Sequence, residues 1–69
     1  MPSVDIEKNV ISYIDERGIK LEAVCRATGI SRNVLQAVKM RGRKLRADEF
    51  QKVCIFLQED PKKFMEMEE

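Results

Sequence analysis

Residues 24–38 read VCRATGISRNVLQAV, and this stretch sets the architecture of the chain. Its first half predicts the end of a short helix over about residues 20–27. Gly29 follows and tolerates the positive φ of a sharp turn. Ser31 can cap a second helix, expected over about residues 31–40, because its hydroxyl can accept a hydrogen bond from a backbone amide two or three residues further on. Two short helices joined by such a turn form a helix-turn-helix.

Three more amphipathic helices are predicted around this unit, over about residues 4–17, 47–58 and 61–67. In the first two, apolar residues recur at spacings of three and four, whereas the third is predicted from Asp60-Pro61, because proline is preorganised for the first helical position. Ser3 and Asp60 are suitable N-caps for the first and the last of the three. The residues expected to face the core are Ile6, Val10, Ile11, Ile14, Val24, Cys25, Leu35, Val38, Phe50, Val53, Cys54, Leu57 and Phe64, with Met65 folding back beside them.

The fold class predicted from this pattern is all-α, a compact bundle of five short helices in a single domain, 1–69. The chain has no Pro- or Gly-rich stretch that would separate two folding units. A chain of this length buries only roughly 60% of the surface of its unfolded form, which leaves little room for an enclosed active site. No segment shows the period-two alternation of a β-strand.

The composition argues against an enzyme, a metal protein and a membrane protein. There is no histidine, no serine or cysteine with a plausible base partner, and no glycine-rich phosphate loop, so neither catalysis nor a cofactor is expected. Cys25 and Cys54 lie far apart and are expected to be small core residues, although the sequence leaves a disulfide open. Without a long apolar run or a secretory signal at the start, the expected location is the cytoplasm, in association with the nucleoid.

The charges are segregated along the chain although the formal net charge is only +1. Residues 23–47 hold seven of the 13 basic residues and none of the 12 acidic ones. A basic run can be a merely solvated face. Local potential rather than net charge, however, governs the encounter of a protein with DNA. The seven basic residues are Arg26, Arg32, Lys39, Arg41, Arg43, Lys44 and Arg46.

The helix over residues 31–40 presents base-reading chemistry on one side. Because Leu35 and Val38 point to the core, the opposite side faces outward. Arginine can bind guanine through two hydrogen bonds, asparagine or glutamine can bind adenine in the same way, and a small methyl can meet the thymine methyl. The alternative is that these side chains only face solvent. The predicted base contacts are Arg32, Asn33, Gln36 and Ala37, with Met40 on the same side.

Phosphate contacts are expected at both ends of this helix-turn-helix. The loop expected at residues 41–44 brings Arg41, Arg43 and Lys44 directly after the second helix, where they can reach phosphates flanking the groove and add affinity rather than specificity. Lys20 adds its charge and nearby backbone amides at the start of the preceding helix. Ser31 is the last of the predicted phosphate contacts. The alternative is that the four charged residues only keep the protein soluble.

The stretch from Val24 to Val38 resembles the helix-turn-helix of the phage repressor and Cro family, also called Xre-like. Residues 6–17, 50–57 and 60–64 resemble the first, fourth and closing helices of that family. The resemblance implies a lambda-repressor-like domain that regulates transcription in a bacterium, phage or mobile element. It further implies a homodimer that places two recognition helices in successive major grooves of a palindromic operator, about 34 to 36 Å apart.

The chain departs from the family pattern at several positions. Leu21 stands where the family usually has a glutamine that touches phosphate and braces the recognition helix, so that contact is expected to be lost. Cys25 replaces a small alanine, Arg46 a capping serine or threonine, and Gln58 a helix-ending glycine.

Two readings of function stay open at this point. The first is a sequence-specific, double-stranded-DNA-binding repressor, favoured by the polar, basic side of the recognition helix. The second is a protein-interaction module with the same fold, of the antitoxin or antirepressor type, which Leu21 favours slightly. The expected dimer surface is the C-terminal segment at residues 64–67, with a frayed tail as the alternative.

Overall fold

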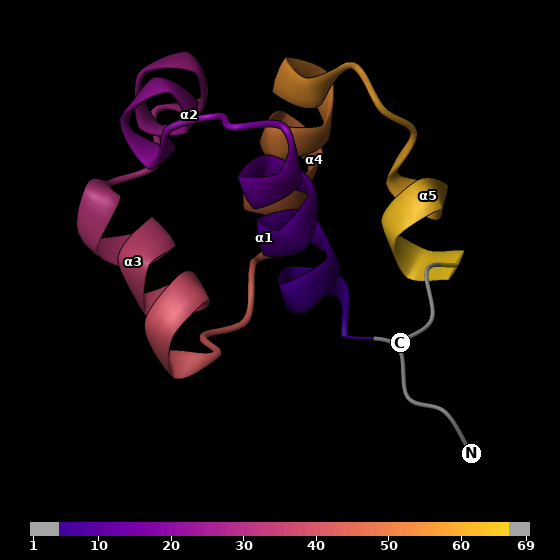
Figure 1. Cartoon of the computed structure of the whole chain (residues 1–69), viewed down its shortest axis with the longest axis horizontal. Coiled ribbons are helices and arrows are strands. Elements are labelled where there is room, and N and C mark those ends of the chain that lie inside the picture. Colours follow the sequence, from indigo (N-terminus) through magenta and orange to yellow (C-terminus); the bar gives the residue numbers. More distant parts are fainter. Residues whose placement is uncertain (1–4, 67–69) are drawn as a thin grey trace.

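A computed structural model describes residues 5–66 of the chain, which form five α-helices and no strand. In Figure 1, α2 and α3 lie together at one end of the molecule, α5 lies at the other, and α1 and α4 lie between them. No helix in this part of the chain is long and apolar enough to cross a bilayer. The predicted all-α, five-helix fold is confirmed. The helices are α1 (Ile6–Glu16), α2 (Leu21–Thr28), α3 (Arg32–Arg41), α4 (Ala47–Leu57) and α5 (Pro61–Glu66).

The first helix begins two residues later than expected. Asp5 has an extended backbone and caps α1, since its Oδ1 accepts a hydrogen bond from the backbone N–H of Lys8 at 3.0 Å. A start near residue 4 is therefore wrong, because a residue with extended backbone precedes the helix. Ser3, the expected cap, lies outside the described residues.

The turn between α2 and α3 is built as the sequence indicates. Gly29 has a φ of 76° and ends α2. The Ser31 hydroxyl accepts from the backbone N–H of Val34 at 3.3 Å and so caps α3. Thr28 adds a contact that the sequence analysis missed: its buried hydroxyl accepts from the N–H of Ile30 at 3.3 Å. These bonds satisfy backbone groups that the two helix ends would otherwise leave open.

The loop after α3 begins one residue later than expected. Arg41 is still helical, and α3 ends because Gly42 adopts a φ of 70°. The backbone N–H of Arg43 donates to the Ala37 carbonyl at 3.2 Å and closes this end. A positive φ at Gly42 costs little because glycine has no Cβ.

The ends of α4 carry residues that are unusual for their positions. At the start, the backbone N–H of Arg46 donates to Glu49 Oε1 at 2.9 Å, which is one half of a capping box. At the end, Gln58 has a φ of 58° and is the one non-glycine residue with positive φ in the described part of the chain. Helix α4 thus ends through a left-handed backbone conformation at Gln58, which is strained because the Cβ lies too close to the following carbonyl oxygen.

Phe64 lies at the centre of the core although it belongs to the short last helix. Its side chain is 0% exposed and packs edge to face against Tyr13, with ring centroids 5.4 Å apart, and against Phe50 at 6.2 Å. Met65 is 46% exposed, so the expectation that it folds back on the core is wrong. Phe64 already occupies the side of α5 that faces the core.

Both cysteines are free thiols, which agrees with their predicted role as small apolar residues. Cys54 is buried, whereas Cys25 is half-buried and packs against the core from α2. Burial raises the pKa of the Cys54 thiol.

Polar contacts also hold α5 against α1. The buried Asn9 amide donates to the Phe64 carbonyl at 2.8 Å. The Tyr13 hydroxyl donates to Glu59 Oε2 at 2.6 Å, and Lys63 Nζ lies 3.2 Å from the same oxygen. These residues fix the side of the molecule that lies away from α3.

Candidate nucleic-acid interface

The outward side of α3 carries the residues predicted to contact bases. Leu35 and Val38 are buried, as predicted. Arg32, Asn33 and Gln36 are exposed on the other side, and Ala37 is half-buried between them. We call this side of α3 the reading face. A hollow of about 390 Å³ on this side is lined by Asn33, Gln36, Ala37, Met40 and Arg41.

The lining of this hollow has a simple electrostatic character. It combines two amide side chains, two apolar side chains and one guanidinium group, and it includes no carboxylate. No described residue forms an ion pair with Arg41, which lies exposed at the end of α3. The hollow therefore offers hydrogen-bonding groups and a cation without a nearby anion to repel phosphate.

A second hollow lies between α3 and the start of α2. It brings Lys20 and Arg32 together although they belong to different elements. Lys20 is exposed and has an extended backbone at the N-cap of α2. Leu21 is half-buried and packs against the core, so it supplies no polar group where the family has glutamine. The lining residues are Asp15, Ile19, Lys20, Leu21, Glu22, Arg32, Gln36, Lys39 and Met40.

Arg43 is held by the protein itself. One guanidinium nitrogen lies 3.2 Å from Glu49 Oε1 and 3.1 Å from the Lys44 carbonyl. The Glu49 carboxylate also accepts the backbone N–H of Arg46, and this bond together with Arg43 lowers the pKa of Glu49. Arg43 thus joins the loop after α3 to the start of α4.

Lys44 is also near a carboxylate but is held loosely. Its Nζ lies 3.5 Å from Glu7 Oε1, and its side chain is 78% exposed. The Glu7 side chain is only 11% exposed and accepts the backbone N–H of Leu45 at 3.0 Å. Glu7 therefore anchors the loop to α1, while the ammonium group of Lys44 stays accessible.

Ser31 combines two capabilities at the start of α3. Its hydroxyl oxygen accepts the N–H of Val34 as a helix cap. A serine hydroxyl retains its own O–H as a donor when it accepts a hydrogen bond.

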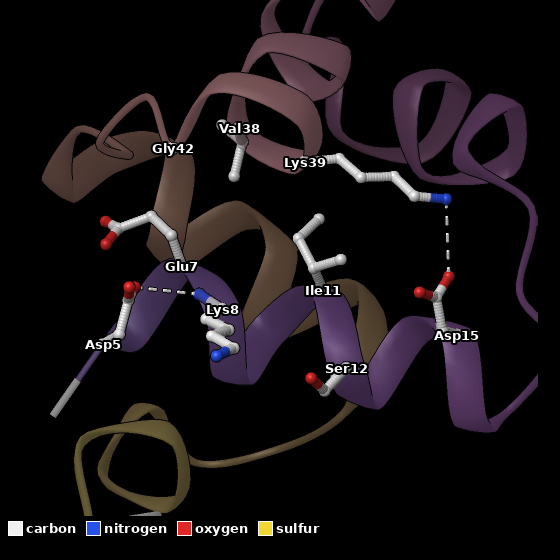
Figure 2. A pocket seen from close by; sticks show the side chains of 9 residues that line it. All are labelled: Asp5, Glu7, Lys8, Ile11, Ser12, Asp15, Val38, Lys39 and Gly42. Carbon is white, nitrogen blue, oxygen red and sulfur yellow. Dashed lines mark hydrogen bonds and ion pairs between the residues drawn. The ribbon is translucent and has the colours of Figure 1, made fainter. Parts of the chain in front are cut away.

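Acidic residues also line a hollow between α3 and α1, and one of them, Asp15, borders the second hollow as well. Figure 2 shows the hollow between α3 and α1, in which Ile11 and Val38 face each other and Lys39 reaches across to Asp15. The ion pair between Lys39 Nζ and Asp15 Oδ1 spans 3.7 Å. The carboxylates of Asp5, Glu7 and Asp15 in this hollow would repel phosphate, as would those of Asp15 and Glu22 in the second hollow. Of these three hollows beside α3, the one lined by Asn33 and Arg41 contains no carboxylate. The lining residues are Asp5, Glu7, Lys8, Ile11, Ser12, Asp15, Val38, Lys39 and Gly42.

Sequence reasoning missed the two carboxylates that organise the basic loop. A local signal was available for Glu49, because a glutamate three residues after an N-cap is typical of a capping box. No local signal exists for Glu7, whose partner Leu45 is 38 residues away in sequence.

The comparison with known families agrees with this geometry. The chain matches the family model of the Cro/C1-type HTH DNA-binding domain over residues 9–69, which include both helices of the helix-turn-helix. None of the curated proteins and none of the solved structures matches the chain. The predicted resemblance to the phage repressor and Cro family is confirmed. The chain belongs to the Cro/C1-type helix-turn-helix DNA-binding domain family.

Proposed function

We propose that this protein is a sequence-specific transcriptional repressor that reads the major groove of a palindromic operator with α3. The observation that carries the proposal is the reading face: exposed amide and guanidinium groups beside a hollow without a carboxylate. Such groups make the paired hydrogen bonds that distinguish one base pair from another. The proposed base contacts are Arg32, Asn33, Gln36 and Ala37.

The proposed phosphate contacts differ in how readily they can act. Arg41 and Lys20 are exposed at the ends of the two helices, and Ser31 keeps a free donor. Lys44 can reach a phosphate by leaving a 3.5 Å contact with Glu7. Arg43 has to break its contact with Glu49 first, so we expect it to contribute least.

We further propose that the protein acts as a homodimer. The symmetry of a palindromic operator requires two recognition helices about 34 to 36 Å apart. Within the C-terminal segment, Phe64 is buried in the core, which leaves the exposed Met65 and Glu66 as the described residues that a partner could contact. Met67, the last residue of the expected dimer surface, lies outside the described residues.

The test is a binding selection from a library of random duplexes, followed by measurements at two salt concentrations. If each subunit neutralises about three or four phosphates, the logarithm of the binding constant of a dimer falls with that of salt concentration at a slope of roughly −5 to −7. The double variant Arg32→Ala with Asn33→Ala keeps nonspecific binding and loses the preference for the selected site. Lys62→Ala is the matched control, because it removes a charge from the exposed side of α5.

A wild-type protein without salt-dependent binding to any duplex would refute the proposal. That result would favour the protein-interaction module, for which the apolar Leu21 at the usual phosphate-contacting position is the supporting observation. The next step would then be a search for an acidic protein partner, because α3 and the loop after it are basic.

A further inference from the structure

Met40 is exposed to an unusual degree for an apolar side chain at a reading face. Its exposure is 76%, higher than that of Ile55 or Met65, the other large apolar residues that are exposed in the described part of the chain. It lies in the last turn of α3 and borders both hollows beside this helix. A single exposed methionine needs no explanation on an ordinary surface. Here, however, it extends a row of base-reading groups.

We infer that Met40 contacts the methyl group of a thymine and adds a thymine preference to the operator. This inference rests on the proposed DNA-binding function. The methyl group at C5 of thymine is the apolar feature that distinguishes this base in the major groove. Methionine offers only a weak acceptor and a flexible apolar chain, so its contribution to reading bases is apolar contact.

The position of Met40 on α3 defines where that thymine lies. Asn33 and Met40 are seven residues apart, which corresponds to about 10.5 Å along the axis of an α-helix. Successive bases of a DNA strand are about 3.4 Å apart along the duplex axis. If α3 follows the groove, Met40 therefore lies about three base pairs beyond the pair that Asn33 reads.

The neighbour of Met40 helps to hold this end of α3 close to the duplex. Arg41 directly follows Met40, lines the same hollow and forms no ion pair with any described residue. A phosphate bound by Arg41 would bring the last turn of α3 toward the DNA strand. Met40 would then be shielded from water by the edge of a base, which gives its apolar contact a favourable free energy.

The experiment replaces each thymine of the selected site, one at a time, by deoxyuridine. Deoxyuridine pairs with adenine as thymine does but lacks the methyl group. We expect one position in each half-site at which this replacement weakens wild-type binding about fourfold, the effect of removing one buried methyl group. Met40→Ala and Met40→Gln should bind the thymine and deoxyuridine duplexes equally at that position, whereas Met40→Leu should retain most of the difference.

Two comparisons make the result specific to Met40. Ala37→Gly tests the other apolar residue of the reading face and should leave the deoxyuridine effect at the Met40 position unchanged. Thermal unfolding should show that the Met40 variants fold, as expected for a residue with 76% exposure. The inference is overturned if no thymine responds to deoxyuridine, or if the response persists in Met40→Ala.

The outcome also separates this inference from the function on which it depends. A wild-type protein that selects a specific site but is insensitive to every thymine methyl refutes the role of Met40 and leaves the DNA-binding proposal standing. A protein that selects no duplex refutes both.

Discussion

The guanidinium group of Arg43 lies 3.2 Å from the carboxylate of Glu49, so a cation in the loop after α3 is tied to the start of α4. The same carboxylate oxygen accepts the backbone N–H of Arg46 at 2.9 Å. One acidic residue thereby caps α4 and restrains the loop after α3. If the domain binds DNA through α3, this carboxylate competes with phosphate for Arg43.

The competition predicts that Glu49→Gln binds DNA more tightly than the wild type. The glutamine carbonyl can still accept the N–H of Arg46, whereas the ionic attraction for Arg43 is lost. Each freed cation that reaches a phosphate makes the salt slope steeper by about 0.9 per subunit. Binding titrations at several salt concentrations measure this slope. Glu16→Gln removes a charge from an exposed residue of α1 and serves as the control.

An unchanged salt slope in Glu49→Gln would contradict this competition, because Arg43 would then contact phosphate in both forms or in neither. In the second case its contact with the Lys44 carbonyl would be enough to hold it in the loop.

The positive φ of Gln58 predicts a stabilising substitution at the end of α4. A non-glycine residue in the left-handed conformation costs about 1 to 2 kcal/mol, and glycine avoids this strain but loses more backbone entropy on folding. We expect Gln58→Gly to raise the free energy of unfolding by about 0.5 to 1 kcal/mol, as measured by urea denaturation. Gln51→Gly, in the middle of the same helix, should instead lower it by a similar amount. A destabilised Gln58→Gly variant would mean that the Gln58 side chain has a stabilising role that offsets its strain.

The hydrogen bond between Tyr13 and Glu59 predicts how stability depends on pH. This bond is the largest cause of the lowered pKa of Glu59, and the hydrogen bond from Lys63 is the second largest. The bond to Glu59 also raises the pKa of Tyr13. A carboxyl group whose pKa is lower in the folded than in the unfolded protein stabilises the fold at pH values above its unfolded pKa. This stabilisation is lost as the pH falls through the folded pKa. A tyrosine whose pKa is higher in the folded than in the unfolded protein stabilises the fold at pH values below its unfolded pKa. This stabilisation is lost as the pH rises through the folded pKa.

Tyr13→Phe should therefore differ most from the wild type between about pH 5 and pH 9, where the wild type keeps a neutral phenol and a carboxylate. Thermal unfolding of both proteins over a series of pH values measures the difference, which should shrink toward both extremes. If the two proteins are equally stable at every pH, the contribution of Tyr13 is the packing of its ring against Phe64, which phenylalanine retains.

The sequence carried most of the information on the fold because the signals are local. Gly29 and Ser31 define the turn between α2 and α3 through their own backbone and side chain, and the structure places both as expected. The core side of α3 follows equally from the spacing of Leu35 and Val38. The prediction that Met65 folds back on the core was wrong because the short helix α5 buries only one large side chain. That side chain is Phe64, which packs against Tyr13 and Phe50.

The candidate site was less predictable because its electrostatics depends on contacts that are distant in sequence. Charge counts along the chain describe residues 23–47 as purely basic. Folding then brings Glu7 to Lys44, Glu49 to Arg43 and Asp15 to Lys39. Among the seven basic residues, Arg32 and Arg41 form no ion pair with a described residue, and this depends on where the acidic residues of α1, α2 and α4 come to lie.

Glu7 provides the test of whether the loop after α3 needs this anchoring. Its carboxylate is nearly buried and accepts the N–H of Leu45, so Glu7→Ala leaves a backbone donor without its partner and should cost about 1 to 3 kcal/mol of stability. Glu7→Gln keeps an acceptor for Leu45 and removes the charge that attracts Lys44, so it should lose less stability and bind DNA more tightly at low salt. Urea denaturation and binding titrations of the two variants distinguish anchoring from charge. If Glu7→Gln weakens DNA binding as much as Glu7→Ala does, the carboxylate positions Lys44 for its phosphate rather than competing with it.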